Sequence, residues 1–213
     1  MKKVEMNLNG STLSIETGHV ARQSAGSVIV THGETSVLVA VNAAKEMRED
    51  IDFFPLQVEY RERHYAGGKI PGGFFKREAR PSENEILTSR LTDRPIRPLF
   101  PKSFKYETQV IITAMSSDGK NMADVLAGIG ASTALTISDI PFNGPIATVR
   151  VGRVEGDFVV NPTREQMEES DMEIVVSGNE KTIVMVEGEA ELISEKEFID
   201  AMKFAHGPIK ELI

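Results

Sequence analysis

The sequence predicts an α+β fold in which mixed sheets pack against helices. Five short alternating segments, typical of strands, occupy most of the first sixty residues. A helical segment, a strand, a second helical segment, four more strands and a last helical segment follow. This order lacks the regular strand–helix alternation of a parallel βαβ sheet and indicates separate layers of sheets and helices.

The first strands are predicted from alternation and from β-branched residues, over residues 4–8, 12–17, 27–31, 36–42 and 56–60. Asn9-Gly10 is a strong hairpin signal, and His32-Gly33-Glu34 marks a second turn. We therefore expect a sheet made of meanders. Residues 37–41 are apolar throughout, which predicts a central strand with both faces covered.

Glycines at 67, 68, 72 and 73 then predict a mobile, exposed loop over residues 61–80. Ser82 and Glu85 have the spacing of a capping box, so a helix should begin there and stop at Pro95. The remaining expected elements are a strand at 109–115, a helix at about 121–138, strands at 146–154, 158–161, 173–177 and 182–189, and a helix capped by Ser194 that runs towards Ile213. We expect one domain over residues 1–213 and a natural polypeptide that continues beyond it.

Composition limits the class of protein. The chain has no cysteine, which excludes disulfides and thiolate metal sites and fits a reducing cytoplasm. No segment approaches the run of about 20 apolar residues that spans a bilayer, so we expect a soluble, cytoplasmic protein without membrane contact. The four histidines show no metal-ligand spacing, and we assign no metal site to this chain.

Charge is distributed unevenly along the chain. The net charge is −8, but residues 61–105 contain eleven basic and five acidic residues, a balance of +6 that leaves −14 for the remainder. An acidic body with one basic segment would direct a polyanion to that segment. The alternative is an ordinary solvated surface of loop and helix.

Phe74-Phe75-Lys76-Arg77 combines two aromatic rings with two cations on a glycine-flanked loop. Single-stranded RNA is bound by aromatic faces that stack on bases and by cations that contact phosphates, so this tetrapeptide predicts an RNA contact. Arg80, Arg90, Arg94 and Arg97 extend the predicted contact, because Arg90 and Arg94 are four residues apart on one helix face. In the alternative, the rings fold back as a loop plug and the arginines pair with Glu83, Glu85 and Asp93.

Residues 68–78 (GKIPGGFFKRE), 80–83 (RPSE) and 87–101 (LTSRLTDRPIRPLFP) closely resemble the first RNase PH-like domain of bacterial polynucleotide phosphorylase. Residues 34–38 and 117–119 extend the resemblance to almost the whole chain. It implies an RNase PH-like fold, also described as ribosomal protein S5 domain 2-like. In that family the Phe-Phe-Arg-Arg loop lies at a channel constriction; here Lys76 replaces one Arg, keeping the charge but not the bidentate geometry. Arg80, Arg90, Arg94 and Arg97 inherit an RNA-contact role by resemblance.

The resemblance also implies an activity, which is 3′-to-5′ phosphorolysis of RNA with inorganic phosphate as co-substrate, and its polymerising reverse, in mRNA degradation. Magnesium is the expected cofactor, with its site in a second RNase PH-like domain that follows a helical linker and precedes KH and S1 domains. A homotrimeric ring is implied, with degradosome-type RNA helicase or endoribonuclease partners.

The active-site motifs of the second domain look degenerate in this chain. Residues 119–123 lack the hydroxyls of a serine-rich phosphate loop; Asp171 remains, Glu173 stands for an aspartate, and Val175 and Met167 replace a lysine and a carboxylate. The charge compensation needed at a transferring phosphoryl group is therefore reduced, and we assign no catalytic residue here. Two alternatives stay open: a self-sufficient phosphorolytic domain that uses Asp171 and Glu173, and a ring scaffold that touches no RNA.

Overall fold

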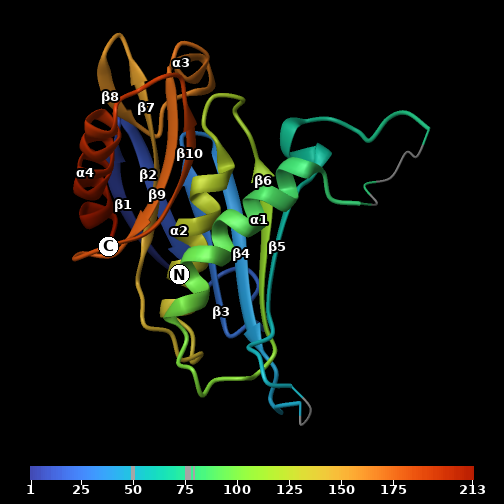
Figure 1. Ribbon diagram of the computed structural model, residues 1–213. Coiled ribbons are helices and arrows are strands. Elements are labelled where there is room, and N and C mark those ends of the chain that lie inside the picture. The colour runs from blue at the N-terminus through green and yellow to red at the C-terminus, as the bar shows by residue number, and fades with distance from the viewer. Residues whose placement is uncertain (49–50, 75–77, 79) are drawn as a thin grey trace.

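The computed structural model describes all residues except 49–50, 75–77 and 79, and it consists of two sheets and layers of helices (Figure 1). The larger sheet contains β1 (Lys2–Leu8), β2 (Ser11–Thr17), β3 (Gly26–His32), β4 (Thr35–Ala43), β5 (Leu56–Glu62) and β6 (Thr108–Ser116), in the order β1-β2-β3-β4-β6-β5. The smaller sheet contains β7 (Ala147–Val154), β8 (Asp157–Val160), β9 (Met172–Gly178) and β10 (Ile183–Ala190), in the order β10-β9-β7-β8. The predicted α+β class is confirmed.

The helices are α1 (Glu83–Ile96), α2 (Ala123–Thr136), α3 (Arg164–Glu168) and α4 (Glu195–Leu212), with short 3₁₀ turns η1 (His64–Gly67) and η2 (Arg97–Leu99). Helix α2 packs on β3 and β4 of one sheet and on β7 of the other, so it lies between the sheets, with α1 beside it. Helix α4 packs on β7, β8 and β9. No helix in the described part of the chain combines the length and apolar character needed to cross a membrane.

The larger sheet begins with the predicted meander. Asn9 and Gly10 have φ of 51° and 76°, as a two-residue hairpin turn of type I′ requires. Two expectations were wrong in part. β5 does not continue the meander but pairs in parallel with β6 at the sheet edge, because its connection to β6 is a long crossover that contains α1. β4 is central, but only one face is fully buried, since Leu38 and Ala40 on the other face are partly exposed.

Helix α2 fits between the sheets because small residues line it. A Cβ on Gly128 would lie 2.6 Å from Oγ1 of Thr148 on β7, and a Cβ on Gly130 would lie 2.6 Å from Cγ2 of Val39 on β4. The two glycines thus let α2 approach a different sheet on each side. The helix ends at Thr136, before the predicted stop at Pro141.

The predicted capping boxes at Ser82 and Ser194 are both present and begin α1 and α4. Helix α1 continues one residue past Pro95, because a proline ring fits a helical φ and Arg97 still donates its backbone N–H to Asp93. Helix α3 was missed, although Thr163 and Gln166 form a capping box, because a five-residue helix has no readable periodicity.

Candidate nucleic-acid interface

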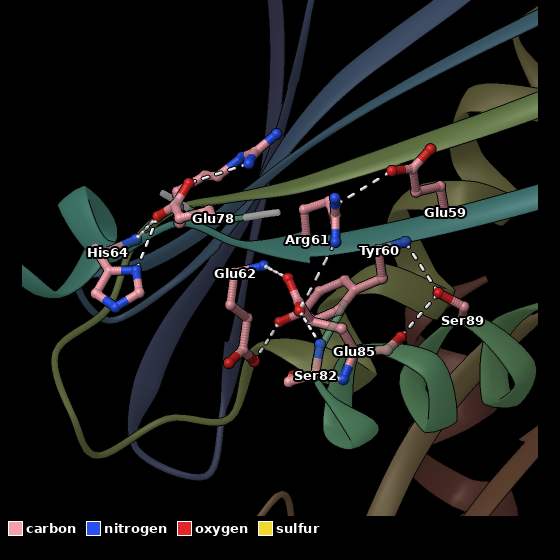
Figure 2. Close-up of polar contacts among 10 residues, drawn as sticks. Glu59, Tyr60, Arg61, Glu62, His64, Glu78, Ser82, Glu85 and Ser89 are labelled. Atoms are coloured by element: carbon pink, nitrogen blue, oxygen red, sulfur yellow. Dashed lines mark hydrogen bonds and ion pairs between the residues drawn. The ribbon is translucent and has the colours of Figure 1, made fainter. Parts of the chain in front are cut away.

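The connection between β5 and α1 leaves the sheet edge as a loop and returns beside its starting point (Figure 1). Its neck is closed by Glu85, a residue only 7% exposed. One carboxylate oxygen of Glu85 accepts the backbone N–H of Glu62 at 2.8 Å, and the other accepts that of Ser82 at 2.6 Å (Figure 2). The same carboxylate therefore caps α1 and ties its first turn to the end of β5.

Glu78 makes a second closure on the exposed side of the neck. Its carboxylate accepts the backbone N–H of His64 at 2.6 Å, lies 2.9 Å from Nδ1 of the His64 ring, and accepts a bond from Arg63 at 3.0 Å. The backbone N–H of His64, its ring and Arg63 together lower the pKa of Glu78 to about 2. Figure 2 shows His64 and Glu78 meeting beside the end of β5. The capping bond between Glu85 and Ser82 was predicted from the sequence, whereas the bond of Glu85 to Glu62 and the closure by Glu78 were not.

The loop presents apolar side chains to solvent. Phe74 is 95% exposed and Ile70 is 90% exposed. For Phe74 the predicted exposure is confirmed, and the alternative in which its ring folds back as a plug is wrong. Phe75, Lys76 and Arg77 lie outside the described residues, so their predicted RNA contacts stay predictions.

The four predicted arginines divide into two pairs. The side chains of Arg80 and Arg90 are exposed and make no hydrogen bond or ion pair within the described part of the chain. Arg94 forms an ion pair with Glu187 on β10. Arg97 binds Asp93 at 2.7 Å and donates to the backbone carbonyls of Phe54 and Leu56 at 3.2 and 3.1 Å.

Arg94 and Arg97 are therefore directed to different sheets rather than gathered on one wall. The ion-pair alternative holds for Arg97 with Asp93, whereas Arg94 takes a partner on a distant strand. Helix α1 has 14 residues and a length of about 20 Å at about 1.5 Å per residue, so the arginines extend well beyond the loop. Phe74, Arg80 and Arg90 offer one aromatic face for a base and two guanidinium groups for phosphates.

The degenerate motifs lie elsewhere, in the loop that leads into α2 and in the segment from α3 to β9. Arg150 is 5% exposed and pairs with Asp124 at 2.5 Å and with Glu173 at 2.8 Å. Burial lowers the pKa of Arg150, but the adjacent Asp124 and Glu173 carboxylates outweigh it and raise the pKa overall. Arg153 pairs with Asp171 and, at 2.5 Å, with Glu197. The hydrogen bonds from Arg153 lower the pKa of Asp171.

Glu173 and Asp171, the two carboxylates that remain in the motif, are thus paired with Arg150 and Arg153. Neither arginine was predicted from the sequence as a functional residue. The arginines lie on β7, which pairs with β9, and this pairing is what brings them to the carboxylates.

Near residues 119–123, the Asp118 side chain accepts hydrogen bonds from the backbone N–H groups of Lys120 and Asn121, both at 2.8 Å, so these amides stabilise the loop itself. Among the described residues, no group of three or more histidine, aspartate or glutamate side chains is placed to hold a metal ion.

A sequence model described as "3′ exoribonuclease family, domain 1" matches residues 11–141, and one described as "domain 2" of the same family matches residues 144–207. The chain belongs to the 3′ exoribonuclease family. The two matches meet where the chain passes from the larger sheet to the smaller one.

Three curated relatives, each named polyribonucleotide nucleotidyltransferase, are 56% identical to this member of the 3′ exoribonuclease family. The Syntrophotalea carbinolica protein matches over 212 residues, which is 100% of this chain and 30% of the relative. The Geobacter sulfurreducens protein matches 99% of this chain and 30% of its own length, and the Thermomicrobium roseum protein matches 98% and 26%. The chain thus spans less than a third of the length of these relatives.

A solved structure described as the Archaeoglobus fulgidus exosome with RNA bound to the active site has the same fold. Its TM-score is 0.76 at 19% identity, over 93% of this chain and 86% of that chain. The predicted RNase PH-like fold is confirmed by this likeness and by the family match.

Proposed function

We propose that this chain is the RNA-binding, ring-forming first core domain of a polyribonucleotide nucleotidyltransferase, a 3′-to-5′ phosphorolytic exoribonuclease, and that the chemistry resides in a second core domain of a longer polypeptide. The identity of more than half of all residues to relatives of that name supports the proposal. The resemblance of the Phe74 loop and of α1 to the RNA-guiding segment supports the role of this domain within it.

One observation carries the RNA contact. Phe74 is 95% exposed on a loop whose neck is fixed by Glu85, and the side chains of Arg80 and Arg90, which follow it in the sequence, are exposed as well. Exposure of the apolar ring surface to water is unfavourable, and stacking on the flat face of a partner removes that surface from water. Bases of single-stranded RNA supply such faces, and their phosphates match the arginines.

In the proposed reaction, an oxygen of inorganic phosphate attacks the phosphorus of the 3′-terminal linkage. The bond between that phosphorus and the 3′ oxygen of the preceding nucleotide breaks, which releases a nucleoside 5′-diphosphate and an RNA shorter by one residue. Magnesium would act in the second domain, because Asp171 and Glu173 of this chain are engaged by arginines. The part of this chain is to bind and orient the strand.

Assembly and context rest on the resemblance. We propose a homotrimeric ring, a cytoplasmic location, participation in mRNA degradation, and association with degradosome-type RNA helicase or endoribonuclease partners. Sedimentation of the chain with and without the remainder of the polypeptide tests the trimer. A monomer in the complete protein would contradict it.

Single alanine substitutions test the RNA contact. Phe74→Ala should weaken binding of a single-stranded oligoribonucleotide about fivefold or more, the loss of one stacked base, without changing its salt dependence. Arg80→Ala and Arg90→Ala should each reduce the slope of log affinity against log salt by about 0.7, the contribution of one phosphate contact on a single strand. Arg22→Ala, at another exposed arginine, is the matched control and should change neither quantity.

The scaffold alternative has one observation in its favour, the engagement of Arg94 and Arg97 within the chain. Unchanged RNA affinity in all three variants would support it and overturn the proposed contact. The self-sufficient alternative predicts phosphate-dependent release of nucleoside diphosphates by the purified chain and loss of that release in Asp171→Ala. We expect no release from the chain alone.

A further inference from the structure

Glu78 is a carboxylate at the edge of the proposed RNA contact, four residues after Phe74 and two before Arg80. A negative charge there repels the phosphate backbone and, taken alone, weakens RNA binding. The contacts of Glu78 point to a different role. All three of its partner groups lie at Arg63 and His64, on the outgoing side of the loop.

The bond from the backbone N–H of His64 is independent of side-chain identity and fixes the distance between the outgoing and returning chains. Arg63 offsets the charge of the carboxylate, so the closure exposes little net charge to a polyanion. Glu85, the other closure, binds at Glu62 and Ser82, farther from Phe74 along the chain. Among the described residues of the returning side, Glu78 is thus the anchored residue nearest to Phe74 along the chain.

We propose that Glu78 is a positioning residue for RNA binding, because it fixes the neck of the segment that carries Phe74 at Arg63 and His64. This inference rests on the proposed RNA contact. A neck fixed before binding leaves less conformational freedom to be lost when the strand arrives, so removal of the closure should weaken binding. The carboxylate therefore favours binding through geometry although its charge opposes it.

The direction in which a substitution changes the RNA affinity separates the geometric role of Glu78 from the effect of its charge. Glu78→Ala should weaken binding of single-stranded RNA about threefold or more, because the loop must then be ordered during binding. The matched control is Glu83→Ala, which removes the same charge from an exposed residue in the first turn of α1. The Glu83 side chain makes no hydrogen bond or ion pair within the described residues. This control should leave the affinity unchanged or raise it. An increase in affinity for Glu78→Ala would overturn the inference.

Glu78→Asp keeps the charge and shortens the reach by one methylene, so it should also weaken binding. If Glu78→Ala fails to fold, this variant decides: an affinity equal to that of the unchanged chain overturns the inference. A double-mutant cycle adds a readout that a merely structural role would not change. With Phe74 already replaced by alanine, Glu78→Ala should have little further effect, whereas a general destabilisation would add its full effect.

The same cycle distinguishes the two proposals. If Phe74→Ala weakens binding and Glu78→Ala does not, the positioning role fails and the RNA contact stands. If neither variant weakens binding, the proposed contact itself fails.

Discussion

Arg150 is 5% exposed and has two acidic partners, Asp124 and Glu173. Glu173, for which the resemblance implies an aspartate in an active copy, is therefore part of an ion-pair network in this chain. The Arg150 side chain is buried, whereas those of Asp124 and Glu173 are 19% and 36% exposed. Loss of Arg150 would leave both carboxylates without their counter-charge, and the cost falls mainly on Asp124, the more buried of the two.

Arg150→Met should lower the free energy of unfolding by about 3 kcal/mol, because Asp124 and Glu173 then lose their counter-charge. Urea unfolding followed by circular dichroism measures it. Arg153→Met is the control: its partners Asp171 and Glu197 are about two-fifths exposed, and the loss should stay within about 1 kcal/mol. Equal losses would show that burial of the Arg150 network contributes no stability.

Glu78 makes a second prediction at this scale. Because the folded-state pKa of Glu78 is lowered to about 2 from an ordinary value near 4.5, the ionised form stabilises the loop above about pH 4.5. That stabilisation is lost as pH falls through the folded pKa. Carbon NMR of the Glu78 carboxyl should show a midpoint near 2, and a midpoint near 4.5 would mean that the His64 and Arg63 contacts do not form in solution.

Among the elements, α2 illustrates how glycine can be required by packing. Gly128→Ala should destabilise the protein by about 1 kcal/mol or more, since its Cβ would lie 2.6 Å from Thr148 and the cost of overpacking exceeds the gain in helix propensity. Gly207→Ala in α4 should have a much smaller effect, because no atom beyond its chain neighbours lies within 4 Å of the added Cβ and the gain in helix propensity is offset by the restriction that Pro208 places on the residue before it. Thermal unfolding of the two variants tests the pair, and an equal loss of stability in both would contradict this packing.

The elements were also the part of the fold most readable from sequence. Local signals such as the capping boxes at Ser82 and Ser194 and the Asn9-Gly10 turn are contained within a few residues, so their positions were predicted. The parallel pairing of β5 with β6 was not, because it joins segments separated by the whole α1 crossover. The exposed alternate face of β4 was missed for a related reason, since an apolar run does not reveal whether anything covers it.

At the scale of the whole molecule, local features of the candidate site could likewise be predicted from the sequence, whereas contacts between distant segments could not. The exposed Phe74 loop and the arginines of α1 were predicted because they lie within about twenty-five consecutive residues. The pairing of Arg94 with Glu187 joins positions 93 residues apart, and that of Arg153 with Asp171 depends on strand register. Only the folded chain reveals that these charges are paired internally, whereas the side chains of Arg80 and Arg90 are exposed.

RNA is proposed to bind along the Phe74 loop and α1. The most direct measurement is crosslinking of a single-stranded RNA that carries a photoreactive uridine, followed by mass spectrometry of the modified peptides. We predict crosslinks within residues 63–97, with the strongest signal at Phe74 or its immediate neighbours, and their loss at high salt. Crosslinks confined to α4 or to the smaller sheet would contradict the claim.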